Sequence, residues 1–145
     1  MSTSAQITAW DTSDPFYSDI GFDAVSGNFT VPLSGRYSIK ATINYSTSAT
    51  IGGSIGASNP AFSVTRTSPT TADLVSGLFP LLNVSVTLLT LRAILGNGTV
   101  TLAGDAELSA GDIIGLFYVA DGLNLSLNLG GSNTGGIVWS MYRMT

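Results

Sequence analysis

The sequence predicts a single all-β domain, and three observations predict it. Apolar and polar residues alternate through several segments, which is the period of a half-buried strand. Gly, Asn, Asp, Ser and Pro gather between these segments at the spacing usual in a β-sandwich or barrel. No segment shows the helical period, and no helix cap precedes an apolar stripe. We therefore expect residues 1–145 to form one domain of about eight to ten strands.

The N-terminal part is expected to begin with a strand at residues 4–10 and a loop at residues 11–19. The segment 21–37, GFDAVSGNFTVPLSGRY, then indicates a turn, a short strand, a second turn and the entry into a long strand. An Asx-turn at Asp23, followed by a glycine that can adopt positive φ, explains the first turn. Pro32 lacks a backbone donor, which suits the end of a strand better than its middle.

The clearest strand lies at residues 36–46, where apolar and polar side chains alternate without interruption. Its apolar face should enter the core and consists of Tyr37, Ile39, Ala41, Ile43 and Tyr45. Residues 46–59 are rich in Ser, Thr, Gly and Ala and indicate a loop or a weak edge strand. A short strand is expected at residues 61–67, and a long connection at residues 68–82.

Two signals organise the next segment. Residues 83–95 alternate twice, and the change of parity at Leu88-Leu89 predicts a β-bulge in one strand. Asn97-Gly98 is the strongest hairpin signal in the chain and should connect that strand to the next one at residues 99–108.

Three further strands are expected after a turn at residues 109–111, and they cover residues 112–120, 123–129 and 136–144. A Gly-Gly turn precedes the last of them. That strand, GIVWSMYRM, is apolar on both faces, which indicates that both faces are covered.

One face of this closing strand should pack on the core of the domain. The other face is expected to be covered by another subunit, because aromatic residues and Met are enriched at interfaces. Ile137, Trp139 and Met141 point to one side of the strand, and Val138 and Tyr142 point to the other. A closed core with one exposed tyrosine is the alternative. The aromatic residues predicted to lie at the subunit interface are Trp10, Tyr45, Trp139 and Tyr142.

The composition disfavours several classes of function. Charged residues make up 10% of the chain, against about 25% in typical proteins, and the net charge of −4 argues against nucleic-acid partners and anionic membranes. There is no Cys for a disulfide or zinc–thiolate site, and no His for a Ser-His-Asp triad. No signal peptide is expected from the first residues, and polar residues and Pro80 interrupt the uncharged stretch 74–91 too often for a membrane helix.

The carboxylates indicate turns and solvated edges rather than a reaction centre. Asp105 and Glu107 share one strand face, as a glycosidase pair would, but two such acids are far more often a solvated edge. Asp11, Asp14 and Asp19 lie in one loop without the Gly and terminal Glu of an EF-hand. We therefore expect no catalytic residue, no cofactor and no metal ligand. Calcium is the one metal that the composition allows, and no motif supports it.

Three blocks of sequence carry a family resemblance. The family pattern of the first block is Y-D-x-x-T-G-x-F-x-x-P-x-x-G-x-Y. In this chain Phe22 stands in place of the first Tyr and Ser26 in place of the Thr. The residues that carry the resemblance are Phe22, Asp23, Gly27, Phe29, Pro32, Gly35 and Tyr37. The family pattern of the second block is L-x-x-G-D-x-V-x-L. It corresponds here to Leu108, Gly111, Asp112, Ile114 in place of the Val, and Leu116. The ending SNTGGIVWSMY is the third. Together they resemble the complement C1q and tumour-necrosis-factor-like superfamily from about Ile7 to Met144, closest in style to bacterial members such as heads of spore-surface collagen-like filaments.

The resemblance implies a ten-strand jelly-roll sandwich that assembles as a homotrimer, so that the subunit interface would be a trimer interface. It implies a non-catalytic head of an extracellular or spore- or cell-surface protein, which acts in trimer assembly, adhesion or ligand recognition. The expected partners are the chain itself and, through the resemblance, a collagen-like stalk or a surface ligand, although no Gly-X-Y repeat occurs here. Neither nucleic acid nor membrane insertion is expected.

Two alternative functions stay open. One is a phage or viral fibre-tip or capsid jelly roll, which the sequence does not separate from a surface head. The other is a carbohydrate-binding jelly-roll module that uses exposed aromatic residues such as Trp10 or Tyr17 as sugar platforms.

Overall fold

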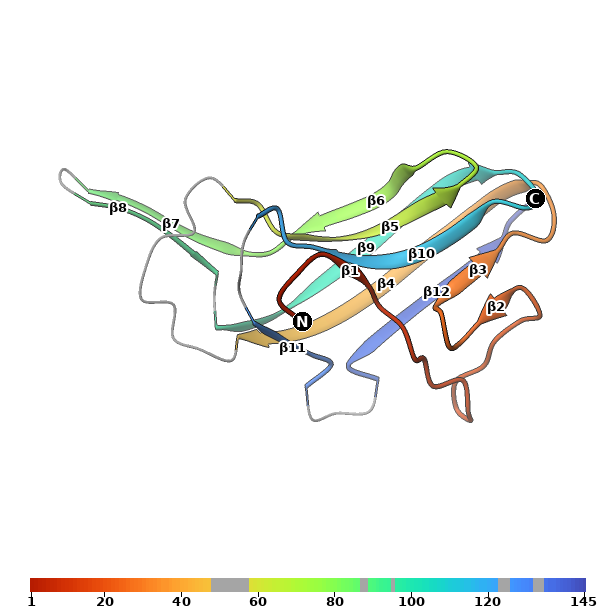
Figure 1. The fold of residues 1–145 in the computed structure, drawn as a ribbon, viewed down its shortest axis with the longest axis horizontal. Coiled ribbons are helices and arrows are strands. Elements are labelled where there is room, and N and C mark those ends of the chain that lie inside the picture. Colours follow the sequence, from red (N-terminus) through yellow and green to blue (C-terminus); the bar gives the residue numbers. More distant parts are fainter. Residues whose placement is uncertain (48–57, 87–88, 95, 123–125, 132–134) are drawn as a thin grey trace.

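The chain is built from strands, and the computed structural model contains no helix among the residues that it describes. These are residues 1–47, 58–86, 89–94, 96–122, 126–131 and 135–145, with the backbone alone for 81–86 and 89–94. Figure 1 shows the strands, with colours that follow the sequence from the N-terminus (red) to the C-terminus (blue). Their bounds are β1 Ala5–Gln6, β2 Phe22–Asp23, β3 Asn28–Thr30, β4 Gly35–Thr47, β5 Ala61–Ser68, β6 Ala72–Leu78, β7 Leu81–Val86, β8 Leu89–Ile94, β9 Asn97–Leu108, β10 Ile113–Val119, β11 Leu127–Leu129 and β12 Ile137–Arg143.

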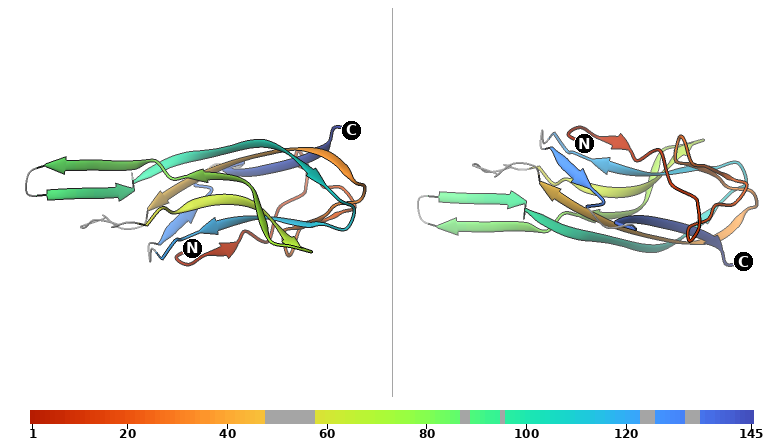
Figure 2. Two further views of the ribbon diagram at one scale, coloured as in Figure 1. Left: turned by 90° about the horizontal axis from the view of Figure 1, so that it is seen from above. Right: turned by 90° about the horizontal axis from the view of Figure 1, so that it is seen from below.

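Two sheets of six and four strands form the sandwich. The six-stranded sheet has the order β2-β3-β10-β5-β6, and β1 also pairs with β10. In the four-stranded sheet β4 is central, with β9 on one side and both β11 and β12 on the other. Figure 2 shows the two layers edge-on. The predicted all-β sandwich of ten strands is confirmed.

The core lies between the layers, and β4 supplies one side of it. Its predicted apolar face is confirmed, because each of these side chains is at most 3% exposed: Tyr37, Ile39, Ala41, Ile43 and Tyr45. The facing sheet supplies fully buried residues from two neighbouring strands: Phe62 and Val64 of β5, and Ile114, Leu116 and Tyr118 of β10. The alternation along β4 thus places every second residue in the core, as a period of two requires.

The first predicted turn of the segment 21–37 forms as expected, whereas Gly35 of the second already belongs to β4. The Asp23 carboxylate accepts hydrogen bonds from the Val25 N–H at 3.0 Å and the Ser26 hydroxyl at 2.7 Å. Gly27 closes this turn with a φ of 77°, and a Cβ there would lie 2.9 Å from the Trp10 indole nitrogen. A side chain at position 27 would therefore be strained by its backbone and would also collide with Trp10.

Strand β6 lies within residues 68–82, where the sequence predicts a connection, so that prediction is wrong. β6 is the last strand of its sheet, and its side chains are half-buried or exposed. Val64 pairs with Val75 and Thr65 pairs with Asp73, which leaves Leu74 as an extra residue. The resulting bulge interrupts the alternation from which a strand is recognised.

Residues 83–95 are predicted as one bulged strand, but residues 83–86 and 89–94 belong to two antiparallel strands, so that prediction is wrong. β7 and β8 pair with Val86 opposite Leu89, and residues 87, 88 and 95 lie outside the described residues. A reversal of the chain shifts the apolar parity just as a bulge does, so the pattern alone does not separate them. Figure 2 shows the β7–β8 hairpin projecting from one end of the sandwich.

The hairpin turn predicted at Asn97-Gly98 is also wrong, since both residues lie inside β9 and pair with β4. Gly98 stands opposite Tyr45, and a Cβ at Gly98 would lie 2.8 Å from the Tyr45 hydroxyl oxygen. Glycine is therefore needed here to make room for a tyrosine ring rather than to reverse the chain.

The remaining strand predictions are confirmed in part. The strand expected at residues 4–10 is shortened to β1, because the chain turns away at Ala9, whose φ is 58°. Within the segments expected at 46–59 and 123–129, residues 48–57 and 123–125 lie outside the described residues. β11 and β12 lie where the last two strands are expected, although β11 is only three residues long.

Candidate functional site

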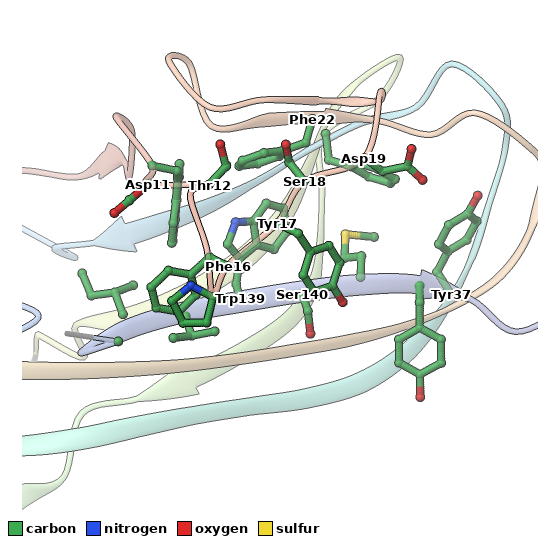
Figure 3. Close-up of a pocket in the computed structure, with 18 of the residues that line it drawn as sticks. Asp11, Thr12, Phe16, Tyr17, Ser18, Asp19, Phe22, Tyr37, Trp139 and Ser140 are labelled. Atoms are coloured by element: carbon green, nitrogen blue, oxygen red, sulfur yellow. The ribbon is translucent and has the colours of Figure 1, made fainter.

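A groove of about 900 Å³ runs along β12 and is the candidate functional site. Its walls are β12, the loop 11–19 and residues of β2, and Figure 3 shows the side chains that line it. The volume is in the range of about 300–1,000 Å³ that is usual for ligand sites. The loop lies on the side of β12 that faces away from β4 (Figure 1).

Three aromatic rings form the floor of the groove. Trp10, Phe22 and Trp139 contact one another, with ring centroids 5.8–6.4 Å apart. The Trp10 indole N–H donates a hydrogen bond of 3.0 Å to the Ile7 carbonyl, which fixes the ring. These contacts join the N-terminal segment, β2 and the closing strand into one apolar cluster.

The rim of the groove exposes large apolar side chains to solvent. Tyr17 is 86% exposed, Leu33 is 60% exposed and Tyr142 is 52% exposed. Val138 belongs to the same rim and is 37% exposed. Exposed apolar residues that gather around one groove indicate a contact surface rather than the scattered exposure of ordinary surfaces.

One backbone edge of β12 has no partner in the described parts of the chain. Asn44 donates to the Gly136 carbonyl and Met144 donates to the Arg36 carbonyl, so the even-numbered residues of β12 exchange hydrogen bonds with β4. The alternation of an antiparallel ladder then directs the N–H and C=O groups of the odd-numbered residues away from β4. These residues are Ile137, Trp139, Met141 and Arg143.

Two carboxylates and one cation also line the groove. Asp11 accepts hydrogen bonds from both the hydroxyl and the N–H of Ser13, and these bonds lower the pKa of Asp11 below its usual value. Asp19 accepts a hydrogen bond of 2.6 Å from the Ile20 N–H. Figure 3 shows Asp11 and Asp19 at opposite ends of the loop, with the aromatic rings between them. Arg143 donates from Nε to the Ser34 carbonyl at 3.0 Å.

The structure places the predicted interface residues in different environments. Tyr142 is exposed on the outer face of the four-stranded sheet, whereas Trp10 and Trp139 are half-buried in the groove. Tyr45 is 3% exposed, and its ring packs on Phe79 with centroids 4.5 Å apart. The prediction that Tyr45 meets a second subunit is therefore incompatible with its position inside the sandwich.

The two aromatic residues of the sugar-platform hypothesis both line the groove. The Trp10 ring is half-buried there and packs against Phe22 and Trp139. Tyr17 remains exposed at the rim.

The acidic residues singled out in the sequence do not converge. Asp105 and Glu107 are exposed on β9, opposite Ser38 and Arg36 of β4. Among the described residues, no three acidic side chains come together where they could hold a metal ion, and this includes Asp11, Asp14 and Asp19.

The other motif residues shape turns and packing. Phe29 packs edge-on to Tyr37, whose hydroxyl donates to the Leu33 carbonyl at 2.7 Å. Pro32 lies between β3 and β4, and a Cβ at Gly35 would clash with the carbonyl oxygen of Thr145. Gly111 has a φ of 92° in the turn before β10.

Asp112 has the most specific structural role of these residues. Its side chain is 4% exposed, and one oxygen lies 3.4 Å from an Arg66 guanidinium nitrogen. The same oxygen accepts a hydrogen bond of 3.1 Å from the Ser109 N–H. Asp112 therefore ties the turn before β10 to β5.

The comparisons with known proteins show the fold of the chain. Neither a protein-family model nor a curated protein matches the sequence. Crystal structures of murine APRIL, a tumour-necrosis-factor family protein, are similar, one with a TM-score of 0.53 at 16% identity over 88% of this chain and 80% of that chain. A second, determined at pH 8.0, has a TM-score of 0.50 at 14% identity over 86% of this chain and 87% of that chain.

The globular domain of zebrafish complement 1qA protein is similar over 99% of this chain and 95% of that chain, with a TM-score of 0.52 and 12% identity. The predicted resemblance is therefore confirmed at the level of the fold, which is the jelly roll of C1q- and tumour-necrosis-factor-like domains. In the described residues there is no helix with the length and apolar character needed to cross a membrane.

Proposed function

We propose that this chain is a non-catalytic homotrimeric head domain of an extracellular or spore-surface protein, acting in trimer assembly, adhesion or ligand recognition. The fold shared with C1q- and tumour-necrosis-factor-like domains supports this proposal. The antiparallel pairing places β12 beside β4 and leaves one face of that pair outside the sandwich.

The observation that carries the proposal is a partly apolar patch, with one charged residue, on the outer face of the four-stranded sheet. It contains Val138 and Tyr142, which are 37% and 52% exposed, beside Ser140. Small neighbours surround them through the registers of β4 and β9: Thr42, Thr101 and Ala103. We call these six residues, together with Lys40 between Ser140 and Ala103, the outer patch. Small side chains allow a second sheet to approach closely, and the exposed aromatic residue supplies contact area.

Charge is consistent with association through this patch. Lys40 lies within the patch, and its ammonium stands 5.9 Å from the centre of the Tyr142 ring. The attraction between a cation and an aromatic ring offsets part of the free energy that is lost when an interface removes the cation from water. Three chains would carry three times −4, or −12, so a nucleic-acid partner is not proposed.

The test replaces Tyr142 by glutamate and measures the particle mass by light scattering. In a trimer held by the outer patch, Tyr142→Glu removes the aromatic ring and buries three carboxylates in the interface, so the mass should fall from three chains to one. Val25→Glu is the matched control, because Val25 is 80% exposed in the turn between β2 and β3. Equal masses for Tyr142→Glu and the parent protein, with unchanged circular dichroism, would exclude this interface.

The phage or viral fibre-tip alternative shares the fold and the trimer, so neither the patch nor its test separates it from a surface head. Localisation of the native protein on spores, cells or virus particles with an antibody decides between them.

A further inference from the structure

The geometry points to the groove along β12 as a site that binds an extended basic peptide by strand addition. The peptide would pair antiparallel with the free edge of β12 and would place alternate apolar side chains over the aromatic floor. The unpaired edge and the aromatic floor lie outside the outer patch, whereas Val138 and Tyr142 belong both to the rim of the groove and to the outer patch.

The first argument is the row of unpaired backbone groups. Ile137, Trp139, Met141 and Arg143 each direct an N–H and a C=O away from β4, and no described residue pairs with them. An edge of this kind is a template for another strand. At roughly 3.4 Å per residue, the seven residues of β12 match a peptide segment of similar length.

The second argument is the side-chain pattern that the groove demands. In an antiparallel addition, residues opposite Trp139 and Met141 face inward with them, above the cluster formed with Trp10 and Phe22. The intervening residues face outward beside Ser140, where polar side chains stay hydrated. The site therefore selects a peptide with apolar residues at every second position.

The third argument is charge. Asp11 and Asp19 stand at the two ends of the loop beside the groove, and the loop hydrogen bonds of each engage one carboxylate oxygen. A peptide with lysine at both ends brings a cation toward each carboxylate, while the Arg143 guanidinium, which also lines the groove, donates from Nε to the Ser34 carbonyl. The edge strand β6 of a second copy fits less well, because it carries Asp73.

The test is calorimetric titration with an acetylated and amidated nine-residue peptide, in which lysines flank alternating valine and threonine. Two N-methylated versions are the matched probes. In the antiparallel addition the inward-facing valines also direct their N–H groups to β12. Methylation of the valine nitrogens should weaken binding by about tenfold or more, whereas methylation of the threonine nitrogens should leave the affinity unchanged.

Two protein measurements complete the test. The double variant Asp11→Asn, Asp19→Asn keeps an acceptor for each loop hydrogen bond and should weaken binding by about threefold to tenfold. Asp105→Asn removes an exposed carboxylate elsewhere and should have no effect. On binding, amide exchange should slow at Trp139, Met141 and Arg143, while Val138, Ser140 and Tyr142 are already protected by β4.

Three outcomes would overturn the inference. One is equal affinity for the two methylated peptides, and another is no binding by protein that is folded by circular dichroism. The third is a fall in particle mass during the titration, which would mean that a neighbouring subunit occupies the groove. Because mass and affinity are read separately, a monomer that binds the peptide contradicts the trimer alone, and a trimer that does not bind contradicts the strand-addition site alone.

Discussion

At the scale of residues, three core tyrosines differ in whether their hydroxyls have partners. Tyr37 donates to the Leu33 carbonyl, whereas the hydroxyls of Tyr45 and Tyr118 are buried without a hydrogen-bond partner among the residues that the structure describes. A buried hydroxyl without a partner costs about 1–3 kcal/mol. We expect Tyr45→Phe and Tyr118→Phe to leave the free energy of unfolding unchanged or to raise it by about 1 kcal/mol.

Tyr37→Phe is the matched comparison and should lower the free energy of unfolding by about 1 kcal/mol, because its hydrogen bond is lost. Urea unfolding followed by tryptophan fluorescence measures all three variants. A loss of stability in Tyr45→Phe as large as that in Tyr37→Phe would show that the Tyr45 hydroxyl has a partner.

The same burial makes stability depend on pH in the alkaline range. Burial raises the pKa of Tyr45 and of Tyr118 above the usual value of 10.0. The unfolded chain then loses phenolic protons at lower pH than the folded chain, so stability is intact below pH 10 and falls above it. The double variant Tyr45→Phe, Tyr118→Phe should show a smaller decline in melting temperature between about pH 9 and pH 11 than the parent protein.

The buried carboxylate of Asp112 should matter more to stability than an exposed one. Asp112→Ala removes both the ion pair with Arg66 and the hydrogen bond from Ser109. We expect a loss of about 2–3 kcal/mol in the free energy of unfolding, at the low end for buried pairs because Arg66 is 25% exposed. Asp105→Ala is the control and should change stability by less than about 0.5 kcal/mol.

At the scale of elements, the β7–β8 hairpin is separable from the sandwich. Within the described chain these strands pair with each other alone, and Phe79 before them is buried in the core. Replacement of residues 82–94 by a short Gly-Ser turn that keeps Phe79 should preserve the far-ultraviolet circular dichroism of the sandwich. The melting temperature should stay within about 5 °C of the parent value. Loss of cooperative unfolding would show instead that the hairpin supports the sandwich.

The elements that the sequence predicted well are those with an uninterrupted period. β4 alternates from Tyr37 to Tyr45, and its core face follows directly from that pattern. β6 was not predictable, because the bulge at Leu74 and its place at a sheet edge disrupt the alternation. The hairpin predicted at Asn97-Gly98 was wrong, because the glycine there makes room for the Tyr45 ring. That contact joins residues far apart in the sequence, so the local pattern does not show it.

At the scale of the whole molecule, the fold could be predicted from the turn residues of one sequence motif. The groove could not be predicted, because it forms where segments distant in the sequence meet. The motif from Phe22 to Tyr37 predicted the jelly roll, and the comparisons confirm that fold. The apolar pattern of β12 indicated that both of its faces are covered. It could not show that Trp10 and Phe22 cover one face within the chain, or which edge of β12 lacks a partner, because both depend on tertiary pairing.

The central claim is that three copies of this chain assemble into a trimer. Light scattering of the unmodified protein at micromolar concentration tests it most directly, since one chain has a mass of 14.9 kDa. The account predicts three times that mass, about 45 kDa, across the eluting peak. A peak at 14.9 kDa would contradict it.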